Sequence, residues 1–310
     1  MRKIGILGGG HVGATAAFVA ASRDLGEVAI YDIQEGVPAG KALDMTQTAP
    51  ALGYDGLVTG SHDPAILSGC DVVIVAAGFP RKPGMDRMDL LKKNVEIAES
   101  AGNIVKTHAP DSVVITVTNP LDVMTWVVQQ KSGFEPARVM GMAGMLDSAR
   151  FSAFITLELG CSPKDVRAMV LGGHGDSMVP LPRFSTVDGV PITELIPADR
   201  IEAMVDRTRK GGAEIVKLLG TGSAYYAPGS CAVLMAEAVL NDTGRILPCS
   251  TWADGHYGLG EVYVGLPIQI GAGGVRKIVD LDLSGDELAA LKTSADGVAK
   301  GIAEVKALAG

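Results

Sequence analysis

The chain has 310 residues, which is enough for about two domains of roughly 150 residues each. Its 27 Lys and Arg residues against 35 Asp and Glu residues give a formal net charge of -8, which excludes a nucleic-acid-binding protein that relies on a basic surface. A hydrophobic fraction of 47% excludes a disordered chain.

The first half alternates short apolar runs with longer helical patterns. We expect helices over residues 12–22, 40–49 and 89–106. The apolar runs predict strands over residues 3–7, 27–31, 58–60, 71–77 and 112–117. Continuous apolar strands separated by helices favour a parallel sheet that is covered on both faces. The first half is therefore predicted to be a doubly wound α/β (Rossmann) domain.

Residues 8–13 have the pattern G-x-G-x-x-G between the first strand and the first helix. Gly8 permits the tight turn, Gly10 lets a pyrophosphate approach the backbone, and Gly13 lets the helix pack on the strand. Asp32 ends the next strand, where a carboxylate accepts hydrogen bonds from a ribose and repels a 2′-phosphate. We therefore expect NAD rather than NADP, the alternative being an ordinary glycine turn with a capping aspartate.

A Gly- and Pro-rich segment over residues 78–87 follows the strand at 71–77 and carries three cations, Arg81, Lys82 and Arg87. It lies at the carboxyl edge of the predicted sheet, where ligands bind in such folds. The segment is interpreted as a lid that brings arginines over an anion, or else as a solvated basic loop. Asn119 ends the next strand at the same edge and could bond a substrate oxygen or the nicotinamide region.

The second half has mixed α+β character. We expect helices over residues 146–159, 200–219, 230–240 and 287–308. A strand is predicted over residues 166–171, and antiparallel strands are predicted within 245–270. The change of pattern places a domain boundary near residues 140–146, which gives an NAD-binding domain over 1–143 and an α+β catalytic domain over 144–310. No linker separates them, so a large interface is expected.

His174 follows the predicted strand at 166–171 and stands among three glycines that free its backbone to project the imidazole into a cleft. Asp147 is its candidate partner, because a carboxylate on Nδ1 fixes the tautomer and leaves Nε2 for proton transfer. Arg150 shares a helix face with Asp147 and could meet an anionic substrate. A local Asp147–Arg150 salt bridge is the alternative. A lone histidine is most often structural, and we interpret His11, His62, His108 and His256 in this way.

The four cysteines are far apart, which favours reduced thiols and a cytoplasmic location. The five histidines are scattered as well, so no metal site is expected. No apolar run reaches about 18 residues, and the N-terminus is better interpreted as a strand than as a signal peptide.

Taken together, these segments resemble the lactate/malate dehydrogenase family over essentially the whole chain. The resemblance rests on GGGHVG, YDI, AAGFPRKPGMDR, TNPLD, GMAGMLDSAR, GGHGD and GSAYYAP. It implies that His174 exchanges the proton with Asp147 as its partner, and that Arg150 binds the C1 carboxylate. Arg87 would polarise the carbonyl when the lid closes, and Arg81 would occupy the substrate-discriminating position. Asn119 and Ser223 complete the implied substrate contacts.

The resemblance also implies a cofactor site. Its residues would be Gly8, Gly10, His11, Val12, Gly13, Asp32, Gly78, Asn94, Val117 and Asn119. One departure is the sequence GGGH, where GAG is common in the family, and the extra glycine does not block pyrophosphate binding.

Arginine at position 81 is similar to the malate-type members. The implied activity is NAD-dependent hydride transfer between (S)-malate and oxaloacetate in a homo-oligomer, with a tetramer favoured over a dimer. One alternative is a lactate or other 2-hydroxy acid dehydrogenase, which shares every residue except the role of Arg81. Another is a non-catalytic NAD-binding protein, which would not need a proton relay. Neither nucleic acid nor membrane is an expected partner.

Overall fold

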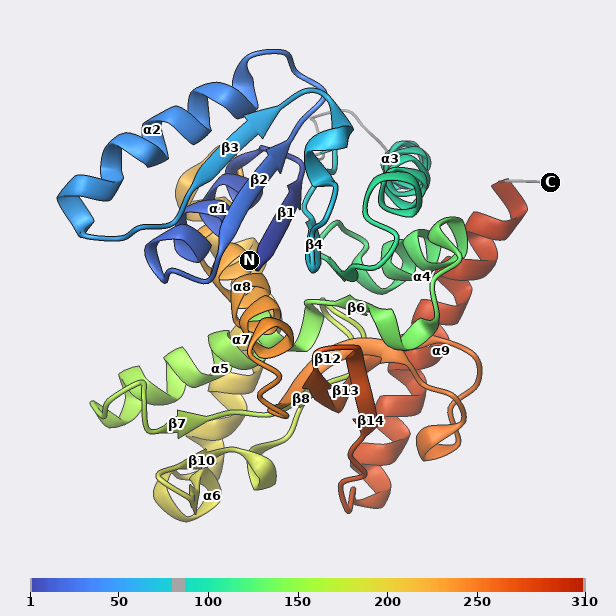
Figure 1. The fold of residues 1–310 in the computed structure, drawn as a ribbon. Coiled ribbons are helices and arrows are strands. Elements are labelled where there is room, and N and C mark those ends of the chain that lie inside the picture. The colour runs from blue at the N-terminus through green and yellow to red at the C-terminus, as the bar shows by residue number, and fades with distance from the viewer. Residues whose placement is uncertain (1, 80–86, 309–310) are drawn as a thin grey trace.

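The computed structural model describes residues 2–79 and 87–308 and shows strands and helices in two connected halves (Figure 1). Six parallel strands come from the first half: β1 (Lys3–Leu7), β2 (Glu27–Tyr31), β3 (Val58–Ser61), β4 (Val72–Val75), β5 (Val113–Thr116) and β6 (Val139–Gly141). Their order in the sheet is β3-β2-β1-β4-β5-β6. This is the strand order of doubly wound dinucleotide-binding folds, so the predicted parallel sheet is confirmed.

Helices cover both faces of this sheet because its strands are apolar on both sides. The helices of the first half are α1 (His11–Ser22), α2 (Val37–Leu52), α3 (Arg87–His108) and α4 (Leu121–Ser132). Ile4 and Ile74 belong to the core cluster that includes residues of α1, α2 and α8 (Tyr226–Leu240) of the second half. Val73 and Val75 belong to the cluster that includes residues of α3, α4 and α9 (Gly285–Leu308). Adjacent strand residues thus point to opposite cores, as the pleat requires.

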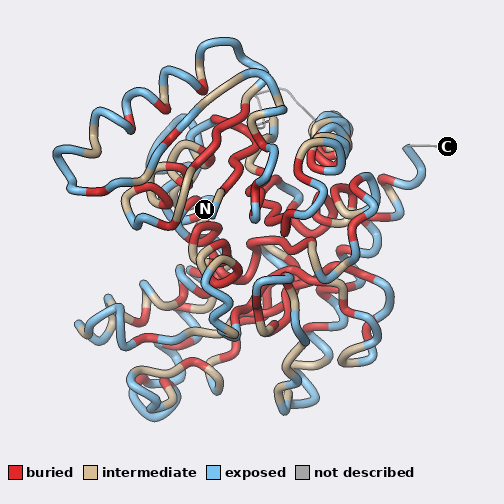
Figure 2. Tube along the Cα trace, viewed as in Figure 1, coloured by how far each residue is buried: buried red, intermediate tan, exposed pale blue. Residues whose placement is uncertain are grey.

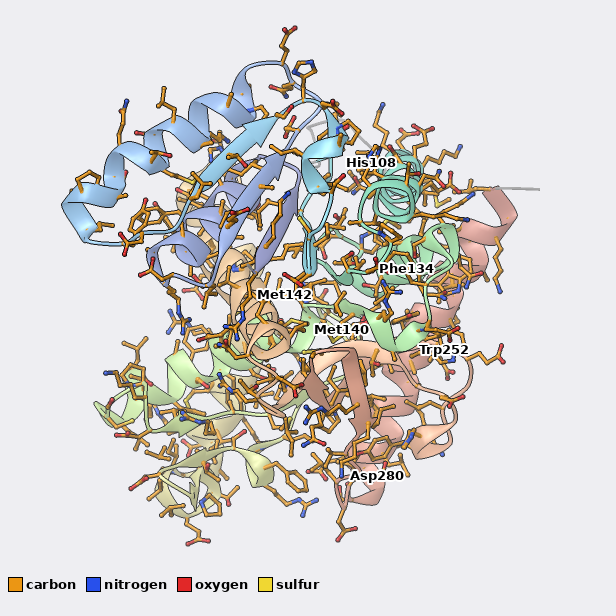
Figure 3. All side chains as sticks on the ribbon, viewed as in Figure 1. His108, Phe134, Met140, Met142, Trp252 and Asp280 are labelled. Carbon is orange, nitrogen blue, oxygen red and sulfur yellow. The ribbon has the colours of Figure 1, made fainter. Side chains whose placement is uncertain are left out.

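The second half contributes longer strands to the same sheet. These are β12 (Ile246–Trp252), β13 (Tyr263–Gly271) and β14 (Gly274–Ile278), and they run antiparallel to one another. Ser250 of β12 pairs with Gly141 of β6, which joins the two halves into one nine-stranded sheet. Met140 and Met142, labelled in Figure 3, are buried beside this junction. The sequence predicts antiparallel strands here but not their attachment to the first sheet.

The second half also contributes five helices. They are α5 (Ala143–Leu159), α6 (Ile192–Leu195), α7 (Ala198–Leu219), α8 (Tyr226–Leu240) and α9 (Gly285–Leu308). Short strands are β7 (Val166–Arg167), β8 (Val170–Leu171), β9 (Val179–Pro180), β10 (Thr186–Val187) and β11 (Val190–Pro191). Four 3-10 helices are η1 (Pro64–Leu67), η2 (Pro136–Arg138), η3 (Pro182–Phe184) and η4 (His256–Gly258).

Two local expectations differ from the structure. The strand predicted over 166–171 is divided into β7 and β8, which pair in two different small sheets. Helix α4 and strand β6 have no counterpart among the predicted elements. Eight of the twelve residues of α4 are buried, so this helix lacks the polar face by which an amphipathic helix is identified. Figure 2 shows the buried segments concentrated around the sheet and the helices that cross it.

No helix within residues 2–79 and 87–308 combines the length and the apolar character that a membrane crossing requires.

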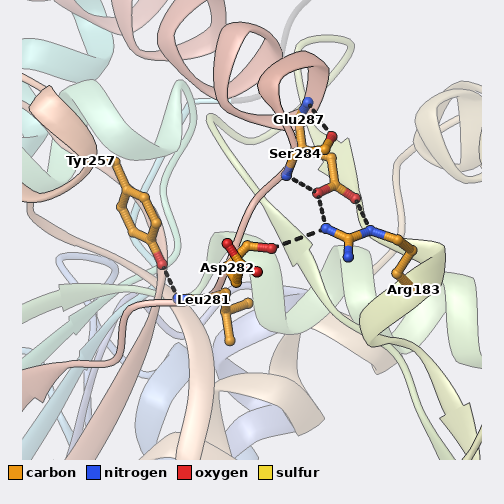
Figure 4. A network of polar contacts seen from close by, with 6 residues as sticks. All are labelled: Arg183, Tyr257, Leu281, Asp282, Ser284 and Glu287. Atoms are coloured by element: carbon orange, nitrogen blue, oxygen red, sulfur yellow. Dashed lines mark hydrogen bonds and ion pairs between the residues drawn. The ribbon is translucent and has the colours of Figure 1, made fainter.

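The start of α9 is fixed by a network of polar contacts (Figure 4). Ser284 and Glu287 form a capping box, in which the Ser284 N–H donates to Glu287 Oε2 at 2.8 Å and the Glu287 N–H donates to Ser284 Oγ at 3.2 Å. Arg183 adds an ion pair to the same carboxylate at 2.6 Å and donates to the Asp282 carbonyl. Tyr257 accepts a hydrogen bond from the Leu281 N–H at 2.7 Å. Helix α9 is therefore anchored just where it begins.

We predict that Glu287→Ala lowers the free energy of unfolding by about 1–2 kcal/mol, because it removes a cap and an ion pair together. The bond from Arg183 lowers the pKa of Glu287 below its usual 4.5, so this stabilisation is present above that pH and disappears as the pH falls through the lower folded value. Urea unfolding at pH 7 and pH 3 measures both effects. Asp286→Ala is the control, because it keeps both contacts, and an equal loss in the control would contradict the assignment.

Candidate active site

The glycine loop joins β1 to α1 with little room for side chains. Gly8 has a φ of +105°, and a Cβ there would lie 2.4 Å from the Ala77 nitrogen. A Cβ on Gly13 would lie 1.9 Å from the Gly8 carbonyl oxygen. A Cβ on Gly10, by contrast, would meet nothing within 4 Å. The loop thus has no space for side chains where α1 packs on β1, but it has free space at Gly10, where the sequence pattern predicts the pyrophosphate.

The surroundings of this loop fit a dinucleotide. Gly10 caps α1 without a side-chain hydrogen bond, so the first N–H groups of the helix and their partial positive charge remain available to phosphate oxygens. The Asp32 carboxylate lies beside the loop, where Oδ2 accepts from the Gly9 N–H at 2.7 Å and Oδ1 accepts from the Gln34 N–H at 3.0 Å. Lys41 donates to the Gly9 carbonyl. The residues present can therefore hold NAD.

His174 and Asp147 meet as a buried pair. His174 Nδ1 lies 2.9 Å from Asp147 Oδ2, and the Asp147 side chain is 2% exposed. Arg150, one helical turn further along α5, places its Nη1 at 3.5 Å from Asp147 Oδ1. A single buried carboxylate therefore lies between an imidazole and a guanidinium. The structure brings these three predicted residues together.

The charges around His174 favour its protonated form. Burial lowers the pKa of His174, but the charge of Asp147 and its hydrogen bond raise it, and Asp122 raises it further. Arg150 acts in the opposite direction. The result is a pKa above the usual value for histidine, which suits a group that donates a proton near neutral pH.

The main chain of the histidine loop is held by three different elements. Gly172 and Gly265 of β13 form an isolated antiparallel bridge. The Gly173 N–H donates to Ser294 Oγ of α9 at 2.8 Å, and the His174 N–H donates to Asp122 Oδ2 of α4 at 2.9 Å. Sequence reasoning missed Asp122 and Ser294, because neither lies near His174 along the chain.

Two neighbouring cavities are lined by His174. One has a volume of about 330 Å³ and extends toward α7, and the other has a volume of about 560 Å³ and extends toward α3 and α9. The wall that α7 gives to the smaller cavity consists of residues spaced as one helix face: Arg209, Gly212, Ala213 and Val216. Val12, Val117, Asn119, Arg150 and Ser223 also line it. This cavity therefore contains residues from both predicted binding sets.

Two adjacent glycines inside α7 pack on Arg150. A Cβ on Gly211 would lie 3.2 Å from Arg150 Cδ, which is a crowded contact, and a Cβ on Gly212 would lie 3.5 Å from Arg150 Nη2, which is an ordinary one. Glycine inside a helix costs about 1 kcal/mol relative to alanine. The pair is visible in the sequence as GG within the helix predicted over 200–219, but its contact with Arg150 is not. Gly211 therefore lets α7 approach the Arg150 side chain closely.

Asn94 links two strand ends beside the cavities. Its Oδ1 accepts from the Phe79 N–H at 2.7 Å, and its Nδ2 donates to the Asn119 carbonyl at 2.8 Å. Gly78 packs on Thr118, where a Cβ would lie 2.9 Å from the threonine methyl group. His11 stacks near Tyr225, with ring centroids 5.2 Å apart. Asn94 and Gly78 thus hold the carboxyl edge of the sheet in shape.

Arg81 lies outside the described residues. Arg87 begins α3, and its side chain also lies outside the described part of the structure. The predicted lid and its two arginines therefore remain predictions. Within the part of the chain that the structure describes, no group of three or more His, Cys, Asp or Glu side chains could hold a metal ion.

Comparisons with known proteins identify the same family for both halves. The family models described as lactate/malate dehydrogenase, NAD binding domain and alpha/beta C-terminal domain match residues 2–141 and 144–309. A malate dehydrogenase of Thermomicrobium roseum is 53% identical over 99% of both chains. The structure of a malate dehydrogenase from Salinibacter ruber superposes with a TM-score of 0.95 at 48% identity, covering 99% of this chain and 98% of that one.

A solved lactate dehydrogenase from Cryptosporidium parvum, in complex with lactic acid and nicotinamide adenine dinucleotide, is also similar. It has a TM-score of 0.93 at 42% identity and covers 97% of both chains. The fold is therefore shared by proteins named malate dehydrogenase and proteins named lactate dehydrogenase. Because the fold is the same, discrimination between malate and lactate has to come from local residues.

We predict that Asp147→Asn lowers the pKa of His174, because the substitution removes the charge that raises it and leaves burial and Arg150 to oppose protonation. NMR titration of the His174 ring measures the midpoint. His256→Asn, at a partly exposed histidine that pairs with Asp280, is the control and should leave that midpoint unchanged. An unshifted midpoint in Asp147→Asn would show that the pair does not control the proton.

Proposed function

The chain belongs to the lactate/malate dehydrogenase family, and we infer from this that it interconverts (S)-malate and oxaloacetate with NAD as cofactor. Relatives named malate dehydrogenase are about half identical to it over nearly their whole length. The site observation that carries the inference is the contact between His174 Nδ1 and Asp147 Oδ2, with Arg150 beside the same carboxylate.

This contact assigns a role to each nitrogen of the ring. Nδ1 faces Asp147, which fixes the tautomer and stabilises the imidazolium, so Nε2 is left to exchange a proton with the substrate oxygen. His174 accepts the hydroxyl proton during malate oxidation and returns it during oxaloacetate reduction. The nicotinamide ring supplies or accepts the hydride when NAD is bound.

The substrate class is a dicarboxylate, and we propose that two arginines divide its charges. The Arg150 guanidinium has the planar geometry that binds one carboxylate by two hydrogen bonds. Arg81 takes the distal carboxylate, and Arg87 polarises the carbonyl. Pyruvate lacks the distal carboxylate and would leave Arg81 unpaired. Because an unpaired buried polar group rejects a shorter analogue strongly, this division favours oxaloacetate.

The glycine loop, the start of α1 and Asp32 are proposed to hold NAD. Gly8, Gly10, His11, Val12 and Gly13 carry the pyrophosphate, and Asp32 takes the ribose hydroxyls. Gly78, Asn94, Val117 and Asn119 shape the nicotinamide end. The open space at Gly10 and the uncapped start of α1 support this arrangement.

We also propose the domain limits, the oligomeric state and the cellular location of the protein. The domain limits of 1–143 and 144–310 agree with the change of pattern along the chain. Exposed apolar side chains on α2 and at the end of α7 support a homo-oligomer, with a tetramer favoured. Four free cysteines support a reducing, cytoplasmic environment.

The rival functions fit less well. A lactate dehydrogenase would share His174, Asp147 and Arg150, but the relatives that cover nearly the whole chain at about 50% identity carry the name malate dehydrogenase. A non-catalytic NAD-binding protein would not need a buried carboxylate to hold a histidine beside an arginine.

We predict that His174→Asn retains NADH binding but lowers kcat for oxaloacetate about 10²- to 10⁴-fold, because the proton donor is lost. NADH fluorescence measures binding, and NADH absorbance measures turnover. His256→Asn is the matched control and should retain both. Turnover close to that of the native protein in His174→Asn would overturn the assignment.

We predict that Arg81→Gln reduces the preference for oxaloacetate over pyruvate by at least ~100-fold, because the distal carboxylate loses its partner. The measurement is kcat/KM for both substrates by NADH oxidation. Lys82→Gln removes the same charge from the neighbouring position and should leave the ratio unchanged. An unaltered ratio in Arg81→Gln would show that another residue selects the substrate.

A further inference from the structure

Asp122 is a buried acid for which the reaction described above has no role. It lies in the first turn of α4 and is 4% exposed. Its Oδ2 accepts a hydrogen bond from the His174 N–H at 2.9 Å, and Ser250 is a second polar neighbour that favours its charged form. Burying a carboxylate is unfavourable unless its charge is compensated, so a neutral side chain would be the better acceptor if the role were purely structural.

We propose that Asp122 is a positioning residue for malate oxidation and oxaloacetate reduction, which fixes the main chain of His174 and places a second buried negative charge near the imidazole. The proposal rests on the assignment of His174 as the proton-exchanging group. Asp147 contacts the ring, and Asp122 contacts the backbone of the same residue. His174 is thus held at both ends by carboxylates from two different helices.

The charges in this cluster support the proposal. With Asp122 and Asp147 ionised and with His174 and Arg150 protonated, the four charges cancel. Loss of the proton from His174 leaves a buried net charge of minus one, which is unfavourable where the dielectric constant is low. Two carboxylates therefore favour the imidazolium more strongly than Asp147 alone, and they compensate for the nearby positive charge of Arg150.

The position of Asp122 supports its ionised form. It lies at the N-terminus of a twelve-residue helix, where the partial positive charge of the helix favours a carboxylate. The pKa of Asp122 is raised above its usual value, mainly by burial and also by the charge of Asp147. Ser250, the His174 N–H and the charge of His174 oppose this rise. The ionisation of Asp122 is therefore coupled to that of His174, since each charge stabilises the other.

Other charged groups also face His174 from the elements packed around it. Within the described residues these are Asp147 and Arg150 of α5, Arg209 of α7, Glu304 of α9 and Asp176 of its own loop. Asp147 hydrogen-bonds the ring of His174, and Asp122 accepts a hydrogen bond from its backbone N–H. The effect of the Asp122 charge can be separated from the effect of its hydrogen bond. The bond goes to the His174 backbone, so a neutral side chain can keep it while the charge is removed.

The test is Asp122→Asn, which preserves an oxygen for the His174 N–H and removes the charge. We expect the midpoint of the high-pH limb of kcat/KM for oxaloacetate to move down by about 0.5 to 1 pH unit, because His174 loses its proton more readily. NMR titration of the His174 ring should show the same shift. Ser294→Ala is the matched control, since it removes an uncharged bond to the adjacent Gly173 N–H and should leave the midpoint in place.

An unshifted midpoint in folded Asp122→Asn would overturn the proposal, as would an equal shift in Ser294→Ala, which would point to loop displacement alone. If Asp122→Asn does not fold, Asp122→Ser tests the same loss of charge. The ring titration needs no turnover, so it separates this proposal from the proposed function. If the native protein does not reduce oxaloacetate, the proposed function is contradicted. The titration midpoint of the His174 ring tests the role of Asp122 independently of that result.

Discussion

A carboxylate that is almost completely removed from water has to be paired, and this requirement organises the site around Asp147. Its side chain is 2% exposed and lies between His174 and Arg150. Removing one partner would leave a buried charge uncompensated, which is strongly unfavourable. The same carboxylate therefore links the histidine proposed to exchange the proton to the arginine proposed to bind the substrate carboxylate. Helix α5 provides the geometry, because positions 147 and 150 share one face.

The fold serves this pairing by bringing distant segments to the loop that carries His174. Strand β13, helix α9 and helix α4 each contact one of three consecutive residues, Gly172, Gly173 and His174. Helix α4 belongs to the first half of the chain, and α9 is its last element. The nine-stranded sheet joins both halves, so the loop that carries His174 is fixed by elements from both halves of the chain. A mobile loop without these contacts could not keep the imidazole in one position and orientation.

Local patterns predict the parallel sheet, the glycine loop and the isolated histidine, because each depends on residues that are close in sequence. They do not predict α4, whose burial on most sides removes the helical period. Nor do they reveal Asp122 or Ser294. These residues lie 52 and 121 positions along the chain from His174 and Gly173, whose N–H groups donate hydrogen bonds to them. The roles of Arg81 and Arg87 remain predictions, since no contact of either side chain is described. Sequence patterns find elements and reactive groups, whereas the supporting contacts depend on tertiary packing.

Several residues around the site would be unfavourable if stability were the only requirement. Gly211 and Gly212 weaken α7, and a buried acid at position 122 is costly in an apolar core. Gly40 also lies within a helix, but a side chain there would meet nothing within 4 Å. A Cβ at 211 would crowd Arg150 Cδ at 3.2 Å, whereas a Cβ at 212 would make an ordinary contact with the guanidinium. Gly211 and Asp122 thus contact Arg150 and His174 themselves. This placement argues that both side chains have to keep one geometry, because an alanine at 211 would strengthen the helix but crowd the stem of Arg150.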